Sequence, residues 1–280
     1  MKRLFLFGSA LLLSACGSGD SRDGIHAEVS ALHHTHDAAM TTAHTANYAP
    51  KHSTSNYKTF RREDGMRIDL QRGLLGISPV ALEPCGIHAA ALVRKIADAL
   101  LPAAHAHGGE THDTGDFIDV LEPDLNTIVD LGSLPAEPGE YCGLVVELLP
   151  APAGTQIGTD DGPLDIGGQS IVVSPCYYPN TVGVPELPAE RTADNAPLFA
   201  HECIDAAYGG PALRTTLAFE TPVTLNGEHR HLEVTVGVIY DRWFEGIAMD
   251  RLASDTAEQG RFAQQVLASL HVHAVGDHAD

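Results

Sequence analysis

The sequence predicts a mainly β protein, namely a β-sandwich of the immunoglobulin- or transthyretin-like kind with one or two peripheral helices. Seven or more short apolar runs are separated by turn residues, which is the pattern of short strands. Only two segments have helical periodicity. The sequence contains no repeat, dinucleotide loop, phosphate loop, nucleophile elbow or His-Glu-x-x-His motif, and this disfavours the enzyme classes that those motifs mark.

Residues 1–16 have the features of a bacterial export signal and are excluded from the predicted fold. A short basic start precedes the apolar run Leu4–Leu13, which is too short to span a bilayer as a helix. The Leu-Ser-Ala-Cys motif that ends at Cys16 resembles a lipobox, which implies cleavage before Cys16 and its acylation. The alternative is an ordinary signal peptide with a chance cysteine. Because Gly17 follows the cysteine, we expect an outer-membrane lipoprotein of the cell envelope, facing the periplasm or the surface.

The chain is strongly acidic, with 17 Lys and Arg residues against 37 Asp and Glu residues. Loss of residues 1–16 removes two basic residues and no acidic one, which leaves 15 against 37 and a formal charge of −22. Such a charge repels nucleic acid, so no nucleic-acid partner is expected. It attracts cations, and the 16 histidines can bind metal while neutral. The alternative is that the acidity serves solubility alone.

Four cysteines remain after export, and an even number in an oxidising compartment predicts two disulfides. They are Cys85, Cys142, Cys176 and Cys203. Three pairings are possible and the sequence does not choose between them; we favour Cys85–Cys142 and Cys176–Cys203, which close the more local loops. A thiolate metal site is the competing interpretation, but no Cys-x-x-Cys spacing is present.

Residues 17–60 contain few bulky apolar side chains and are rich in Ser, Thr, Ala, Gly and His. We therefore expect a disordered tether that links the lipid to a single folded domain at residues 61–275. Loose metal capture by the tether and a merely polar linker are both open interpretations. The tether histidines are His26, His33, His34, His36, His44 and His52.

The first part of the domain is expected to hold strands and one helix. Met66–Leu70 alternates apolar and polar residues, as a strand does. Leu74–Leu82 continues as a second strand or a bent one, in which Pro79 suggests an edge or a bulge. Ala89–Leu101 places its apolar residues on one helical face and is stopped by Pro102.

From about residue 117 onward the pattern is that of β-structure, with one strand expected at the centre of a sheet. That strand is Glu140–Leu149, which is the most continuous apolar run. The other strands expected are Phe117–Leu121, Thr127–Leu131, Gln169–Ser174, Leu213–Glu220, Thr221–Leu225 and His231–Tyr240. The Asn226-Gly227 dipeptide predicts a hairpin turn before the last of these.

A second helix is expected near the end of the chain. Asp255 precedes Thr256 and Ala257 in the arrangement of a capping box, with Glu258 at the position that reaches back to the first residue. The helix is predicted to run from there to about Leu270.

Histidine clusters are the candidate metal ligands. His105, His107 and His112 lie together in the Gly-containing stretch after the first predicted helix, where the alternative is an exposed acidic loop. His229 and His231 are two residues apart at the start of a predicted strand, so both point to one side of it and can share an ion. The alternative for this pair is two exposed strand residues.

The segment Leu134–Leu149 carries a resemblance to a known family. Its Leu-Pro-x-x-Pro-Gly-x-Tyr-x-Gly pattern before an apolar strand resembles the methanobactin-operon P-like, or metallo-mystery-pair, four-Cys envelope proteins. The strand at Val238–Gly246, which ends in an aromatic pair, is similar too. The resemblance implies a β-rich copper-binding protein that works beside a di-haem peroxidase-like partner. It also implies that Trp243, the only Trp, is a candidate for oxidation.

The ligand chemistry and the resemblance together point to a metal-binding envelope lipoprotein for acquisition, buffering or delivery. Imidazole-rich sites suit copper(II), zinc and nickel, and we expect copper first because of the resemblance and zinc second. The alternative is a surface-displayed β-sandwich that binds another protein without a functional metal. An enzyme is the least favoured reading because no acid and base have a diagnostic spacing, so no catalytic residue is assigned.

Overall fold

The structure is a computed structural model that describes residues 24–36, 57–86, 117–125, 127–159, 162–183 and 201–276. Within these residues the chain forms mainly β-strands with two short α-helical segments, so the predicted fold class is confirmed. The strands are β1 (His26–His34), β2 (Lys58–Arg61), β3 (Arg67–Pro84), β4 (Phe117–Asp119), β5 (Val129–Pro135), β6 (Gly139–Leu148), β7 (Gln156–Thr159), β8 (Gly162–Asp165), β9 (Ile171–Tyr178), β10 (Glu202–Cys203), β11 (Ala206–Tyr208), β12 (Arg214–Leu225), β13 (His231–Ile239) and β14 (Leu270–Gly276). The helices are α3 (Met249–Leu252) and α4 (Thr256–Ala268), with 3-10 turns η2 (Pro179–Thr181) and η3 (Tyr240–Arg242).

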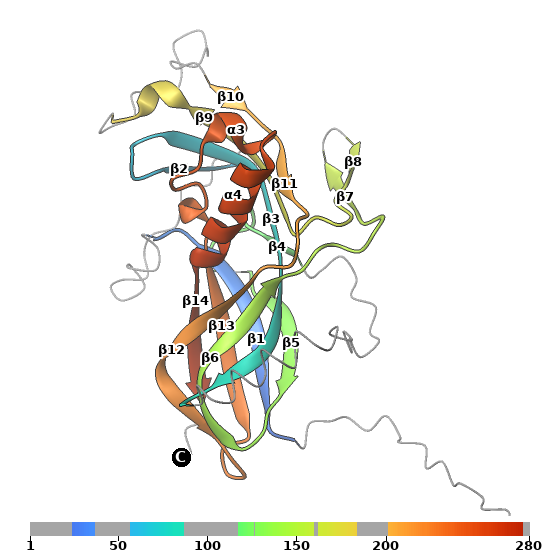
Figure 1. The fold of residues 1–280 in the computed structure, drawn as a ribbon, viewed down its shortest axis with the longest axis vertical. Helices are drawn as coiled ribbons and strands as arrows, with labels where there is room; N and C mark the ends of the chain where they lie inside the picture. Colours follow the sequence, from blue (N-terminus) through green and yellow to red (C-terminus); the bar gives the residue numbers. More distant parts are fainter. Residues whose placement is uncertain are drawn as a thin grey trace, which may run out of the picture.

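Two sheets form the main body of the described residues, and β7 and β8 pair in a separate two-stranded sheet. The first has the strand order β14-β13-β1-β5, and the second has the order β10-β9-β3-β6-β12. In the lower half of Figure 1 the first sheet faces β6, β12 and the end of β3, so that the two form the layers of a sandwich. The apolar side chains between them form one continuous core, because alternate residues of each strand point to the same side.

The long strand β3 connects both halves of the molecule (Figure 1). Its first part, as far as Leu75, pairs with β9, while the part from Ile77 onward pairs with β6. The register shifts between Pro79 and Ala81, so the bulge predicted at Pro79 is confirmed. Proline has no N–H to donate to a neighbouring strand, which explains why the ladder is interrupted there. As predicted, β6 is a central strand, between β3 and β12.

Helix α4 covers part of the upper half of Figure 1. Its inward face carries Phe262, Ala263 and Val266, all at most 1 % exposed. The predicted cap is confirmed, because the Asp255 carboxylate accepts hydrogen bonds from the backbone N–H groups of Ala257 and Glu258.

The second half of the capping-box prediction is wrong. The Glu258 carboxylate accepts a hydrogen bond from the backbone N–H of Ala248, at 2.7 Å, instead of that of Asp255. The Asp255 N–H donates to the carbonyl of Arg251, in the preceding helix α3, and is therefore already occupied. Tertiary packing of α3 against α4 has replaced the local interaction that the sequence suggests.

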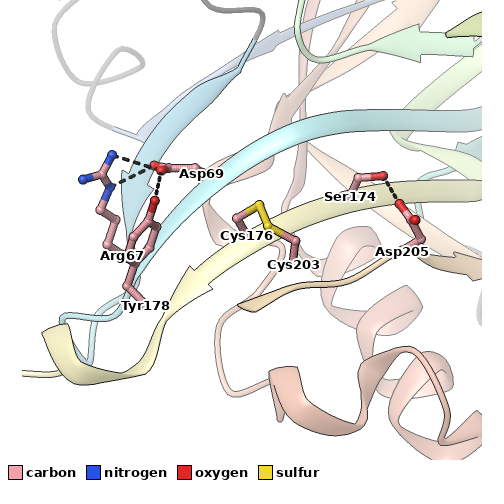
Figure 2. The surroundings of a disulfide bond; sticks show 7 residues. All are labelled: Arg67, Asp69, Ser174, Cys176, Tyr178, Cys203 and Asp205. Atoms are coloured by element: carbon pink, nitrogen blue, oxygen red, sulfur yellow. Dashed lines mark hydrogen bonds and ion pairs between the residues drawn. A yellow bond between two sulfur atoms is a disulfide. The ribbon is translucent and has the colours of Figure 1, made fainter. Parts of the chain in front are cut away.

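Both disulfides favoured from the sequence are present, Cys85–Cys142 and Cys176–Cys203. The second joins directly opposed residues of β9 and β10 (Figure 2). Near it, in the same figure, Arg67 and Asp69 of β3 form an ion pair. The hydroxyl of Tyr178 in β9 donates a hydrogen bond to the Asp69 carboxylate at 2.8 Å, and this bond joins the two strands. Burial and this bond raise the pKa of Tyr178 to about 12.

The predicted tether at residues 17–60 is wrong for the parts that the structure describes. Residues His26–His34 form β1, which lies in the middle of the first sheet between β13 and β5, and β2 begins at Lys58. The inward residues of β1 include Ala27, Val29 and Ala31, which are fully buried or nearly so. These side chains are small but alternate with period two, and it is this alternation, not bulk, that marks the strand.

The predicted hairpin at Asn226-Gly227 is also wrong. A turn is present, since Asn226 N–H donates to the His229 carbonyl, but β12 pairs with β6 whereas β13 pairs with β1 and β14. The turn therefore passes the chain from one sheet to the other. The predicted helix Ala89–Leu101 lies outside the described residues.

Candidate metal centre

The outer face of the first sheet is lined with histidine and carboxylate side chains. Along β1 the residues that alternate with the buried ones point away from the core, and they begin with His26 and Glu28. On β13 the same alternation buries Leu232 and Val234, so His231 points to the outer face, as the sequence predicts.

The pairing of β1 with β13 brings these residues together. The two strands run parallel, and the register places His26 opposite His231 and Glu28 opposite Glu233. Residues paired in this way project their side chains to the same side of the sheet. Two histidines more than half the chain apart in sequence thus become neighbours, with ring centroids 5.0 Å apart.

Glu28 completes a three-residue group. One potential ligand atom from each of His26, Glu28 and His231 lies within 4.8 Å of the other two. The Nε2 atom of His26 is 3.8 Å from Glu28 Oε1, and that of His231 is 3.4 Å from Glu28 Oε2. Among the described residues, no other three His, Cys, Asp or Glu side chains bring their ligand atoms this close together.

Both imidazoles have a nitrogen that can accept a metal. Nδ1 of His26 is 2.9 Å from the carbonyl of Gly24, which only accepts, so Nδ1 carries the proton and Nε2 carries the lone pair. Nε2 of His231 is buried and has no hydrogen-bond partner of good geometry, although Glu28 lies near it. A buried nitrogen without a partner is costly, and a bound cation would relieve that cost.

The arrangement offers two nitrogen donors and one oxygen donor on a partly open surface. The side chains of His26 and His231 are 22 % and 27 % exposed, and that of Glu28 is 63 % exposed. Solvent therefore reaches the group, which leaves room for a water or an exchangeable ligand. Two His and one carboxylate plus an open position is a donor set used for zinc, and metal bonds of about 2 Å would require the side chains to close in slightly.

A second cluster of titratable groups lies inside the molecule. Lys58 pairs with Asp124, which also accepts the Tyr240 hydroxyl at 2.9 Å, while His33 Nε2 donates to the Glu122 carbonyl at 2.8 Å. Burial lowers the pKa of His33 and of Lys58 and raises that of Tyr240. Because the charged groups pair with one another, this cluster accounts for how the loop before β5 is held against β1 and β2.

The residues predicted to bind metal are placed as follows. His231 belongs to the three-residue group, but its predicted partner His229 does not. His229 lies in the turn before β13, which begins at His231, and its backbone N–H donates to the Asn226 side chain. The predicted ligands His105, His107 and His112 lie outside the described residues, and so does Cys16.

Trp243, the candidate for oxidation, is fully buried in the core. Its indole Nε1 has no hydrogen-bond partner among the described residues. Phe244 beside it stacks on Phe60 and on Phe262, so this aromatic pair packs the junction between the sandwich and α4. Oxidation of Trp243 stays a prediction.

Sequence reasoning missed His26 and Glu28 as ligands. Both were assigned to the tether, where a histidine has no fixed neighbours. The signal that marks them is the His-x-Glu spacing in step with the buried alanines and valine of β1, which puts both on one face. Their partner on β13 follows only from the parallel register, which no local pattern encodes.

None of the helices in the described part of the chain is long and apolar enough to cross a membrane. Comparisons of the chain with protein-family models, with curated proteins and with solved structures found no match. The resemblance to methanobactin-operon P-like proteins therefore stays a prediction, as do the di-haem partner and the copper that it implies.

Proposed function

We propose that this chain is an exported, lipid-anchored protein of the bacterial envelope that binds a divalent transition metal at His26, Glu28 and His231. The observation that carries the proposal is the convergence of these three ligand atoms within 4.8 Å on the outer face of the sheet. Acquisition, buffering or delivery of the ion is the role that suits a partly exposed site.

The donor set favours zinc or copper(II). Imidazole nitrogen suits both ions, and a carboxylate oxygen is a harder donor that disfavours copper(I). The acidic chain, with a formal charge of −20 before processing, adds a long-range attraction for cations. The lipobox-like motif at Cys16 supports attachment to the membrane, which would hold the bound ion in the envelope.

The test is a competition titration of the mature full-length chain against a chelator, with zinc and separately with copper(II). We expect His231→Ala and His26→Ala to weaken the tightest site at least about tenfold, since each removes one donor. Glu28→Gln keeps the shape of the side chain, removes its charge and should weaken zinc binding as well.

The matched control is His201→Ala. His201 is exposed and packs on the Tyr178 ring in the other half of the molecule, so its loss removes one histidine without touching the site. If the His26, His231 and His201 variants all titrate like the unchanged chain, the proposed site is refuted. In that case a partner protein retained in the presence of chelator would support the β-sandwich as an interaction module.

A further inference from the structure

We propose that the outer face of the same sheet carries a second transition-metal site, formed by imidazoles alone, at His34, His271 and His273. This site is separate from the one at His26, Glu28 and His231 and does not depend on it. The three rings form a chain across the sheet: His34 and His271 have centroids 5.1 Å apart, and so do His271 and His273.

Strand register explains why these rings meet. β13 lies between β1 and β14, with Gly237 opposite Leu32 on one side and opposite His271 on the other. His34 follows Leu32 by two residues and therefore points to the same outer face. His273 is related to His271 in the same way along β14, which pairs with β13.

Gly237 creates the space for the cluster. A Cβ atom at this position would lie 2.0 Å from Cε1 and 2.3 Å from Nε2 of His271, so no other residue fits without moving the ring. The absent side chain lets the His271 ring lie over β13 and reach toward His34 on the far side of that strand. A glycine in the middle of a strand costs stability, and a close approach of this kind offsets that cost.

The nitrogen atoms are available for a metal. Nδ1 of His34 donates to the Thr35 carbonyl at 2.8 Å, so the lone pair of this ring is on Nε2. Nδ1 of His271 is buried without a hydrogen-bond partner.

Ring spacing is compatible with one shared ion. Two imidazoles on a tetrahedral metal have centroids about 5 Å apart, because each metal–nitrogen bond is about 2 Å long. Ordinary packing of aromatic rings gives similar centroid distances. The evidence for a site is therefore the unpartnered Nδ1 of His271 and the close approach of this ring to Gly237. The ligand atoms of the three histidines do not all lie within 4.8 Å of one another as the rings stand, so a shared ion requires the exposed His273 to change its rotamer.

The two sites differ in place and in preference. His26 and His34 are eight residues apart on one strand, which is about 26 Å, so the ions do not share ligands. The second site lacks a carboxylate among its three ligands, and this favours copper(II) over zinc more strongly than the first site does.

The test follows individual residues, because the chain has 16 histidines and a bulk titration would not distinguish between them. Zinc is titrated into the 15N-labelled mature chain while the imidazole nitrogen signals are followed by NMR, with each signal assigned by its loss in a single variant. We expect the signals of His34, His271 and His273 to shift together. His271→Ala should raise the zinc concentration needed to shift His34 and His273 at least about tenfold and leave the shifts of His26 and His231 unchanged.

Gly237→Ala is the second variant. It keeps all the histidines but displaces the His271 ring, so it should weaken the second site alone. The proposal is overturned if His34, His271 and His273 shift at unrelated zinc concentrations, or if His271→Ala leaves the other two shifts unchanged. If the site at His26, Glu28 and His231 does not bind zinc as one unit, the signals of His26 and His231 will shift at unrelated zinc concentrations. That outcome is distinct from the behaviour of His34, His271 and His273.

Discussion

At the scale of one residue, Glu258 shows how the protein stabilises an ionised carboxylate in its interior. Its side chain is 2 % exposed, yet one oxygen accepts the Ala248 N–H and the other pairs with Arg251 and Arg261. Burial alone would raise the pKa of this carboxyl, but the bond from Ala248 and the Arg261 guanidinium outweigh it and lower the pKa below its ordinary 4.5. The ionised form therefore stabilises the fold.

We predict that Glu258→Ala lowers the free energy of unfolding by about 1–3 kcal/mol at pH 7, because the Ala248 N–H loses its acceptor. A group whose pKa is lowered by folding stabilises the protein above its unfolded pKa and loses that effect as the pH falls through the folded value. The difference from the unchanged chain should thus shrink below pH 4.5.

Urea denaturation at several pH values measures this difference. Glu258→Gln is the matched control, since its amide oxygen still accepts from Ala248 and the loss at pH 7 should be smaller. A difference between Glu258→Ala and the unchanged chain that stays constant from pH 7 to pH 3 would contradict the role assigned to the ionised carboxylate.

At the scale of elements, the turn between β12 and β13 shows that the hydrogen bonds that form a turn do not determine which strands pair on either side of it. The Asn226 side chain accepts hydrogen bonds from the N–H groups of Glu228 and His229, at 2.7 and 2.9 Å. This reverses the chain, as asparagine in a turn does, but leaves open which strands pair afterwards.

Replacing Asn226 by Ala should lower the free energy of unfolding by about 1 kcal/mol, because two N–H groups lose an acceptor. Asn226→Asp keeps the acceptor oxygen and should cost less. Thermal unfolding followed by circular dichroism compares the two variants. Equal losses would mean that the side-chain acceptor is not what holds this turn.

The elements also show what the sequence is able to predict. The continuous apolar run of β6, the apolar alternation of β13, the bulge at Pro79 and the cap at Asp255 are local signals, and all are confirmed. Strand β1 was missed because its buried side chains are small. The partners of β12 and β13 and the role of Glu258 depend on contacts between distant segments, which a local pattern does not encode.

The candidate site was predictable only in part, for the same reason. His231 follows from its place at the start of an alternating strand. His26 and Glu28 join it through a pairing that links residues about 205 positions apart, as at Ser30 and Thr235. No spacing rule of the kind that marks compact metal motifs spans such a separation.

At the scale of the whole molecule, the first sheet depends on a strand from near the start of the chain. β1 pairs on both sides, with β13 and β5, so its removal exposes two strand edges and the core beneath Ala27, Val29 and Ala31. A tether, by contrast, is removed without loss of stability.

We therefore predict that deletion of residues 17–36 abolishes cooperative thermal unfolding, whereas deletion of residues 17–23 leaves the midpoint within a few degrees of the unchanged chain. Differential scanning calorimetry distinguishes the two outcomes. If the longer deletion unfolds with an unchanged midpoint, β1 does not contribute to the sheet as described.

If Cys16 carries a lipid, the early position of β1 limits how far the proposed site at His26, Glu28 and His231 can lie from the bilayer. His26 lies only ten positions after Cys16. A chain of that length spans at most about 36 Å in any conformation. If Cys16 carries the lipid, the first metal site is held in a thin layer next to the membrane, where it would meet ions passing through that surface before the rest of the compartment does.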